Sequence, residues 1–306
     1  MEKQDALQQL AQLIRDAQTR EPLKTSSRLE ALTLLTESIN QALETKDTTS
    51  FGILGRDISQ ELDATLSRLS ALRSLFQRKP LQIGEESKIS LPSPTFATLK
   101  IDGASPDLQT PPRELYVRDQ FVTEFLQLKP DFNAEDLEGA LNSTMESLLK
   151  KEEGMAKTLL RASTESKKEV WAYDELHFID LLKSRNFSTL WASNTFMNKM
   201  VSSITLSEAF VATKSPEEVL IGHIGTLYGV QLILDAFHPS QCRVINQGEM
   251  FLVPRPEVLG KLLVRQTLDA EPCESFILGS RRIGWMVREI IAPVVLDSSS
   301  IVCLEF

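Results

Sequence analysis

The fold of this chain is decided by the stretch Gly225-Thr-Leu-Tyr-Gly229-Val-Gln-Leu-Ile-Leu-Asp-Ala-Phe237, followed by Gly248-Glu-Met-Phe-Leu-Val-Pro254 and by Arg281-Arg-Ile-Gly-Trp285, which runs on to Ile290-Ile-Ala-Pro-Val-Val-Leu296. Each piece is a run of apolar residues next to glycine or proline, which is typical of a buried strand. We expect the first piece to form one glycine-punctuated strand. No residue in the region 221–306 has the pattern of a catalyst, so this part is expected to be structural.

The composition indicates a globular protein of one large domain or two smaller ones. The chain has 306 residues, and 42% of them are apolar, which is enough to fill a core. A net charge of -9 disfavours binding to a phosphate backbone, because that binding depends on Lys and Arg. No run approaches the ~20 apolar residues of a membrane span, and the start Met1-Glu-Lys-Gln-Asp5 lacks the order of a signal peptide. We therefore expect a protein that stays in the cytoplasm.

Three helical segments are predicted at the amino end, because apolar residues recur there at steps of three and four. They cover Leu7–Ala17, Leu29–Leu43 and Leu54–Phe76, with turn-rich breaks at 21–27 and 46–52. These helices could form a small domain, a scaffold-like extension, an arm on a neighbouring subunit, or a layer packed on their own domain.

A two-stranded ribbon is predicted within 78–130. Ala97, Leu99 and Ile101 alternate with polar residues, and Leu115–Phe125 supplies the returning strand. The connector Asp102–Arg113 consists of turn-forming residues. Because an isolated ribbon is marginally stable in water, it needs a surface to lie on. That surface is either the sheet of the same subunit or an adjacent copy of the protein.

The start of a long helix is well marked at Asn133. Asn133 can cap the free amides, acidic residues follow in the first turn, and Phe132 can pack against Leu137. The helix is expected to reach about Ser163, roughly 45 Å at ~1.5 Å per residue, with a weak point near Gly154 where it could break. The charged runs 135–138 and 150–153 are interpreted as solvated helix faces. Shorter helices are predicted at 173–184 and 195–201.

Catalytic and metal motifs do not account for the polar residues of this sequence. The histidines, which lack an HxxxH or HExxH spacing, are His177, His223 and His238. The cysteines, which are too far apart for a CxxC motif and are interpreted as buried apolar residues, are Cys242, Cys273 and Cys303. There is no GxSxG elbow, and the glycines of 222–229 lack the GK[ST] ending of a phosphate loop. We therefore expect a protein that is not an enzyme and needs no cofactor or metal.

Two motifs resemble those of a known family. Ile224-Gly-Thr-Leu-Tyr-Gly-Val230 resembles a glycine-flanked entry to a strand, "G-x-l-x-G-v", and Arg281-Arg-Ile-Gly-Trp-Met-Val-Arg-Glu289 resembles a late strand, "r-x-G-w-x-x-x-e". Both motifs, and the order of the parts over roughly 78–306, are similar to those of tailed-bacteriophage major capsid proteins of the Hong Kong ninety-seven type.

The resemblance implies an α+β fold with five parts. They are a helical amino-terminal arm or scaffold-like extension (1–77), an extended β-ribbon loop (78–130), a peripheral domain with a spine helix (131–206), an axial domain (207–264) and carboxy-terminal strands of the peripheral domain (265–306). The ribbon tip, expected to touch a neighbouring subunit, includes Lys100, Asp102, Asp107 and Arg113. Lys100 lies near the ribbon tip, but no acceptor residue for a covalent crosslink from it can be assigned.

The implied function is a structural one. Copies of the chain would assemble into pentamers and hexamers of an icosahedral head in the host bacterial cytoplasm, become part of the virion and enclose double-stranded DNA without reading its sequence. A portal, a scaffold, a maturation protease and decoration proteins are the further partners that the resemblance implies. Two alternatives remain: an encapsulin-like bacterial compartment with the same fold, and a soluble α+β enzyme with a helical dimerisation module.

Overall fold

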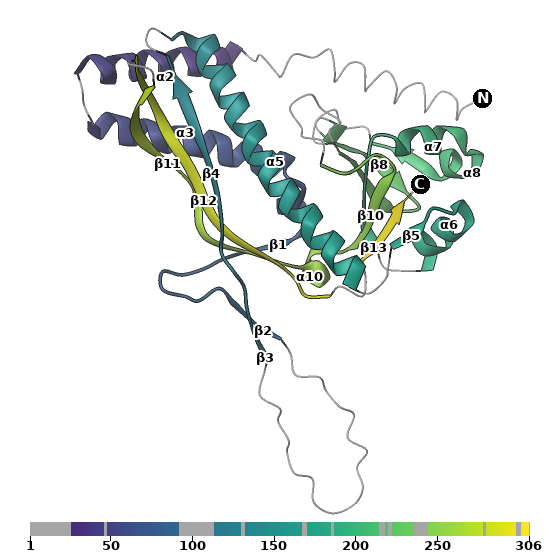
Figure 1. Cartoon of the computed structure of the whole chain (residues 1–306). Helices are drawn as coiled ribbons and strands as arrows, with labels where there is room; N and C mark the ends of the chain where they lie inside the picture. The colour runs from purple at the N-terminus through teal and green to yellow at the C-terminus, as the bar shows by residue number, and fades with distance from the viewer. Residues whose placement is uncertain are drawn as a thin grey trace, which may run out of the picture.

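The computed structural model describes residues 26–45, 48–91, 113–129, 132–166, 170–184, 187–213, 218–219, 222–235, 244–277, 280–297 and 301–305. In these parts, two sheets lie side by side and one long helix, α5 (Ala134–Ser166), runs diagonally from one to the other (Figure 1). The predicted helix Leu7–Ala17 lies outside the described residues. Among the residues described, no helix combines the length and the apolar character needed to cross a membrane.

The first sheet contains four strands in the order β1-β11-β12-β4. Their bounds are Gln77–Pro80 for β1, Gly260–Ile277 for β11, Ser280–Val295 for β12 and Gln120–Leu128 for β4. β11 and β12 form a long antiparallel hairpin, β4 runs antiparallel to β12, and β1 runs parallel to β11. The predicted strand from Arg281 towards Leu296 is therefore confirmed as β12.

One face of this sheet is covered by a layer of helices. The layer consists of α5 with α2 (Ser26–Thr45), α3 (Thr48–Leu69) and α4 (Ala71–Leu75). Leucines and isoleucines of α3 and α5 share one hydrophobic core with Trp285, Val287 and Ile291 of β12. The helical stripe predicted over Leu54–Phe76 thus faces the sheet, but it is not one helix, because Ser70 ends α3 and caps α4. The break expected at 46–52 is too wide, because α3 already begins at Thr48.

The second sheet contains seven strands in the order β5-β13-β10-β6-β9-β8-β7. Their bounds, in chain order, are Val170–Ala172, Phe187–Ala192, Phe210–Ala212, His223–Leu227, Val230–Leu234, Glu249–Pro254 and Val302–Glu305. The helices α6 (Glu175–Ser184), α7 (Phe196–Ser202) and α8 (Ile204–Ala209) lie in this half of the molecule, whereas α10 (Pro256–Leu259) contacts β10 as well as β11 and α4. The helices predicted at 173–184 and 195–201 and the strand in 248–254 are confirmed.

The stretch from Gly225 to Phe237 is not one strand, as the sequence predicted. It turns at Tyr228 and Gly229, so that β8 and β9 form a hairpin with Leu227 opposite Val230. Tyr228 has φ 51° and Gly229 has φ 82°. A positive φ at both central residues is the geometry of the tight turn that matches the natural twist of two paired strands. The chain therefore reverses here within two residues.

α5 begins as predicted but continues without the break expected at Gly154. Asn133 Oδ1 accepts a hydrogen bond from the amide of Asp136 (2.9 Å), and Asp136 Oδ2 accepts one from the amide of Asn133 (3.1 Å). Phe132 and Leu137 are both buried, as a hydrophobic staple requires. The helix runs for 33 residues, about 50 Å at ~1.5 Å per residue. Packing against both sheets outweighs the low helix propensity of two glycines.

The predicted returning strand Leu115–Phe125 is divided between two sheets. Residues 113–116 form β3 (Arg113–Tyr116), which pairs with β2 (Lys88–Leu91), whereas β4 starts at Gln120 in the four-stranded sheet. The residues between them, 117–119, lie outside any strand. The predicted outgoing strand at Ala97, Leu99 and Ile101 lies outside the described residues.

Candidate functional site

A narrow antiparallel ribbon leaves the body of the subunit. β2 and β3 pair only with each other among the described strands, with Lys88 opposite Tyr116 and Leu91 opposite Arg113. In Figure 1 this pair points away from both larger sheets. Lys88 forms an ion pair with Glu114 (3.2 Å), and Tyr116 donates a hydrogen bond to the same carboxylate (3.1 Å). Because these groups are exposed, their contacts stabilise the ribbon only slightly.

The root of the ribbon is fixed by Arg265 of β11. Its Nε donates to Asp119 Oδ2 (2.7 Å), and its NH2 group donates to Ser87 Oγ (2.8 Å). Ser87 and Asp119 lie on opposite legs of the ribbon and also hydrogen-bond to each other. Nearby, Ile89 is buried against Leu263 and other apolar residues of the β11–β12 hairpin. One guanidinium thus clamps both legs, so the direction in which the ribbon leaves is set by the sheet.

The residues predicted at the ribbon tip are not tested by the structure. Lys100, Asp102 and Asp107 lie outside the described residues. Arg113 opens β3 opposite Leu91, but its side chain is also outside the description. Their contact with a neighbouring subunit therefore stays a prediction.

A buried ionic cluster, which we call the Arg73 cluster, joins the helical layer to the four-stranded sheet. The Arg73 side chain is 4% exposed and forms ion pairs with Asp63 (2.6 Å), Glu152 (2.9 Å) and Glu289 (2.9 Å). The carboxylates of Glu152 and Glu289 are 0% and 1% exposed. Ser70, the N-cap of α4, donates a further hydrogen bond to Glu152 (2.5 Å). A single arginine therefore connects α3, α4, α5 and β12.

Burial and nearby charges shift the pKa values of the groups in the Arg73 cluster. Burial and then the charge of Glu152 raise the pKa of Glu289 above its ordinary value, and the Arg73 guanidinium opposes this shift. Burial lowers the pKa of Arg73, but Glu152 and Glu289 more than offset this, and the pKa lies above its usual value. Burial and then the charge of Asp235 raise the pKa of the neighbouring Glu153 to about 9.

The interpretation of 150–153 as a solvated helix face was wrong for its two acidic residues. Lys150 and Lys151 are exposed, but Glu152 and Glu153 are buried. The helical repeat contained the signal, because Glu152 lies four residues after Leu148 and four before Ala156, both of which are in the core. By contrast, the acidic residues at the start of α5 lie at or near the surface, as predicted.

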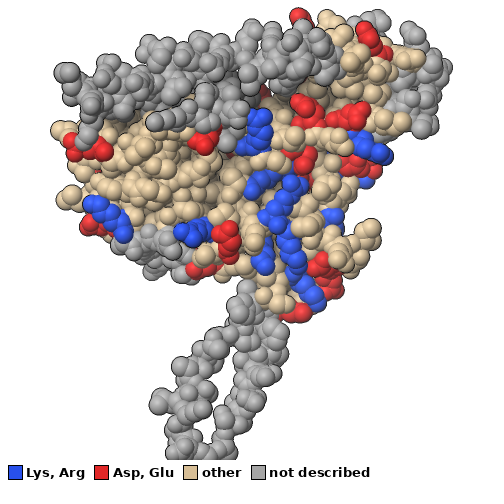
Figure 2. All heavy atoms as spheres, turned by 180° about the vertical axis from the view of Figure 1, so that it is seen from behind, with Lys and Arg blue, Asp and Glu red and all other residues tan. Residues whose placement is uncertain are grey.

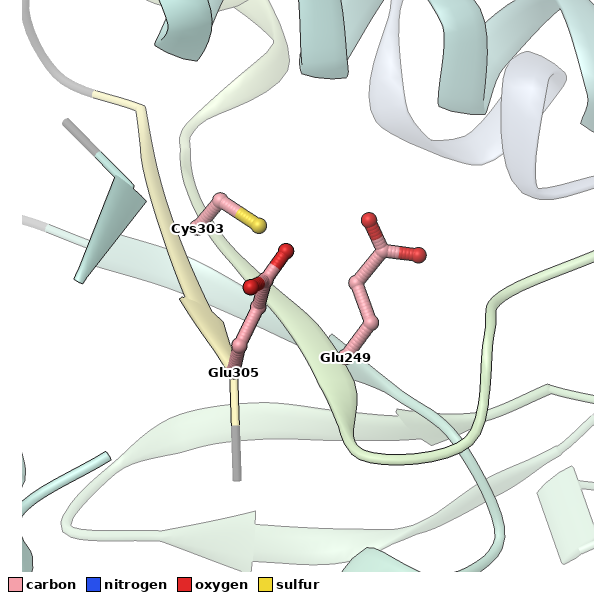
Figure 3. A group of neighbouring side chains, drawn as sticks. All are labelled: Glu249, Cys303 and Glu305. Atoms are coloured by element: carbon pink, nitrogen blue, oxygen red, sulfur yellow. The ribbon is translucent and has the colours of Figure 1, made fainter. Parts of the chain in front are cut away.

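A second cluster lies where α5 meets the seven-stranded sheet. Glu249 of β10 and Cys303 and Glu305 of β13 project on the same side of their strands (Figure 3). Their ligand atoms lie within 4.8 Å of one another, which is close enough for a metal ion. However, one Arg161 NH1 group donates to Glu249 (3.1 Å), to Glu305 (2.6 Å) and to the Cys303 sulfur (3.4 Å). The guanidinium of α5 therefore already supplies the cation that these groups need.

Cys303 is a neutral thiol within this second cluster. Burial and then the charge of Glu249 raise the pKa of the thiol to about 12. Lys157 adds a further positive charge 3.4 Å from Glu249. We interpret this cluster as a lock between α5 and the strands β10 and β13. Cys303 is buried, as predicted; Cys242 and the side chain of Cys273 lie outside the described residues.

A polar hollow of about 240 Å³ lies beside the start of α7. Its lining residues are Ser193, Asn194, Thr195, Asn198, Asp235, Ile245 and Gln247. Its polar groups already hold the backbone of 244–248: Asp235 Oδ2 accepts from the amides of Val244 (2.7 Å) and Ile245 (2.8 Å), and Gly248 donates to Ser193 (3.3 Å) and Thr195 (3.2 Å). The volume also falls below the ~300 Å³ at which ligand pockets begin. The hollow therefore belongs to the contacts that hold residues 244–248 against the start of α7.

Basic side chains gather on one face of the described part of the chain, and several of them pair with carboxylates. Figure 2 shows Lys and Arg in a diagonal band across the face seen from behind, with Asp and Glu on either side. In β1 and β11, Arg78 pairs with Asp63 (3.7 Å), Lys79 with Glu85 (3.2 Å) and Arg265 with Asp119. Together with the net charge of -9, these pairs disfavour tight binding to a phosphate backbone.

Comparison with solved structures identifies the fold. A chain from Mycobacterium phage Bobi superposes with a TM-score of 0.51 and 10% identity, covering 77% of this chain and 90% of that one. This chain has the Hong Kong ninety-seven type fold of tailed-phage major capsid proteins. No protein-family model matches the chain, and no curated protein matches its sequence.

Two further solved structures are similar at lower TM-scores. The virus-like particle from Pyrococcus furiosus has 14% identity and a TM-score of 0.48, covering 82% of this chain and 97% of that one. The holo-SrpI encapsulin complex from Synechococcus elongatus PCC 7942 has 13% identity and a TM-score of 0.46, covering 76% and 85%. The sequence prediction of a Hong Kong ninety-seven type fold is confirmed; at these identities the comparisons concern the fold alone.

Proposed function

We propose that this chain is the major capsid protein of a tailed phage. Copies of it assemble into pentamers and hexamers of an icosahedral head that encloses double-stranded DNA, and the subunit has no enzymatic role. The observation that carries this proposal is the Hong Kong ninety-seven type fold together with a ribbon, β2–β3, that pairs with neither larger sheet and projects from the body beyond its packed root. The assembled head belongs to the virion and forms in the host cytoplasm, where a portal, a scaffold, a protease and decoration proteins can join it.

The parts of the structure fit separate roles in such a shell. Within the ribbon region 78–130 we assign β2 and β3 to the contact with a neighbouring subunit; we assign α5 to the spine, the four-stranded sheet, which includes β1 and β4, to the peripheral body, and β7 to β10 to the axial body. β5, β6 and β13 share the seven-stranded sheet with β7 to β10, so the proposal extends the axial body to these three strands.

The physical reason for assembly is that the subunit is incomplete alone. A two-stranded ribbon gains little stability without a further surface, and its exposed Leu115 and Tyr116 offer apolar area to a partner. In a closed symmetric shell each contact is repeated in every subunit, so weak interfaces sum to a stable particle. Arg265 holds both legs of the ribbon at its root, so the ribbon leaves the body in a fixed direction. Because the ribbon is already oriented, less conformational entropy is lost when it binds a neighbouring subunit.

The ribbon can be tested by replacing residues 102–113 with a glycine-serine segment of equal length. We expect the variant to retain its circular dichroism spectrum and its urea unfolding midpoint but to yield no closed shells by electron microscopy. An Arg265→Met variant, in which the tip is intact but the root is released, should yield fewer or irregular shells. Unchanged yields of regular particles from both variants would contradict the role of the ribbon.

The contents of the particles distinguish a phage head from an encapsulin-like compartment. Particles purified from a phage-producing culture should contain double-stranded DNA of uniform length and little foreign protein. Mass spectrometry that found a stoichiometric enzyme cargo and no DNA would favour the compartment and overturn the phage assignment, although not self-assembly.

A further inference from the structure

α3 and α4 supply the inner wall of the core that covers the four-stranded sheet. Leu54, Ile58, Leu62 and Leu66 form a continuous buried stripe along α3. This stripe belongs to the same core as Trp285, which is fully buried. Removing α3 would expose this face of β11 and β12 over the length of a 22-residue helix. Burial of this kind is the main stabilising contribution in a folded domain.

The approach of α3 to the sheet is unusually close, because a glycine lies at the contact. A Cβ atom at Gly55 would lie 2.2 Å from the carbonyl oxygen of Ala270 and 3.0 Å from Cδ1 of Trp285. Only a residue without a side chain allows the backbones of α3 and β11 to come this near. The helix is therefore fitted to this sheet and is not loosely laid on it.

The Arg73 cluster provides a second, electrostatic attachment of the same segment. Arg73 in α4 provides the guanidinium for Glu152 of α5 and Glu289 of β12, both of which are buried. Loss of α4 would leave the charge of Glu152 inside the protein without this cation, which is costlier than losing an exposed pair.

We propose that α3 and α4 are a permanent part of the mature subunit, and that any proteolytic processing of the amino-terminal extension removes no residue beyond 47. The proposal rests on the proposed function where it concerns assembled particles. Residues 1–77 could be a structural layer or a removable scaffold. Under this proposal, the segment from Thr48 on is a structural layer of the subunit.

The experiment combines intact-mass measurement with limited trypsin digestion of the full chain. Arg56 and Arg68 of α3 have exposed side chains, so trypsin can reach them if the helix unfolds locally. In particles and in unassembled subunits, we expect the protected product to begin no later than Thr48. A stable, folded product that begins after Arg56, Arg68 or Arg73 would overturn the proposal.

A matched pair of variants tests the glycine contact itself. Gly55→Leu should be cut at Arg56 and Arg68 about tenfold faster or more, because the side chain separates α3 from β11. Gly139 of α5 lies in open space, where a Cβ atom would meet no heavy atom within 4 Å. Gly139→Leu should therefore be cut at Arg56 and Arg68 at the wild-type rate. Equal rates for both variants would contradict the proposal. If the chain forms no particles, the digestion of unassembled subunits still decides the matter.

Discussion

Replacing Arg73 by methionine should destabilise the subunit by about 3–5 kcal/mol. The side chain is almost fully buried, and its removal leaves the Glu152 charge inside the core without its cation. Breaking a buried ion pair by removing one partner has a cost of this size because the remaining charge is not solvated. With a urea slope of about 3 kcal/mol/M, the unfolding midpoint would fall by about 1 to 1.7 M. Fluorescence of the buried Trp285, which lies in the same core, reports the transition.

A control for this variant is available five residues further along the chain. Arg78 pairs with the same Asp63 (3.7 Å), but its side chain is 36% exposed, so Arg78→Met should change stability by at most about 1 kcal/mol. Replacing Arg73, Glu152 and Glu289 together by methionine should restore most of the lost stability, since well-packed apolar groups can substitute for a buried ionic cluster. If Arg73→Met and Arg78→Met unfold at the same urea concentration, the reasoning is refuted.

Three further predictions concern pH, packing and capping. The pKa of Glu153 is raised from 4.5 to about 9, so its contribution to stability falls as the pH rises from about 4.5 to 9. The free energy of unfolding of Glu153→Gln should match that of wild type near pH 5 and exceed it at pH 8.5. Urea titrations at both pH values measure this difference, which grows by at most about 1.4 kcal/mol per pH unit. Gly55→Ala should lower stability by about 1–3 kcal/mol, whereas Gly139→Ala, in open space, should raise it by up to about 1 kcal/mol. The two variants should therefore shift the melting temperature in opposite directions, and shifts of the same sign would contradict the prediction. Asn133→Ala should cost about 1 kcal/mol through loss of the α5 cap, and an unchanged melting temperature would mean that the cap is not formed.

Local signals in the sequence were sufficient for the ends of several elements. The start of α5 depends on three neighbouring features, Asn133, Asp136 and the Phe132–Leu137 contact, and the structure contains all of them. Its continuation through Gly154 could not be predicted in the same way. The stabilising contacts come from two sheets that are distant in sequence, and packing of this kind outweighs intrinsic propensity.

The buried acidic residues show what periodicity can and cannot reveal. In β12 the buried positions Trp285, Val287 and Ile291 alternate, and Glu289 falls on the same inward parity. That parity by itself indicates a buried carboxyl group. The identity of its partner is not signalled, because Arg73 lies 216 positions away along the chain. Only the folded arrangement brings the two together.

The β8–β9 turn and the division between β3 and β4 were missed for different reasons. Tyr228-Gly229 lacks the asparagine or aspartate that usually announces a turn with two positive φ values. Residues 117–119 are apolar or charged and look compatible with a continuous strand, but Asp119 is turned towards Arg265 of β11. The turn depends on a backbone conformation that is unusual for Tyr228. The division between β3 and β4 depends on a contact between residues far apart in the sequence.

The two ionic clusters explain why α5 can connect the sheets rigidly. Glu152 binds Arg73, which also binds Glu289 of β12, and Arg161 binds Glu249 of β10 and Glu305 of β13. These residues are nine positions apart on one helix, about 14 Å at ~1.5 Å per residue. A displacement of one sheet relative to the other would therefore have to break a buried ionic contact or bend the helix.

The central claim, that identical copies of this chain complete one another in a closed shell, is tested most directly by sedimentation velocity of the purified full-length protein across a wide concentration range. We predict a species of several megadaltons that appears as hollow particles in electron micrographs of the same sample; discrete pentamers and hexamers are the smaller assemblies expected beside it. A single, well-folded 34.3 kDa monomer that persists at the highest concentration would contradict it.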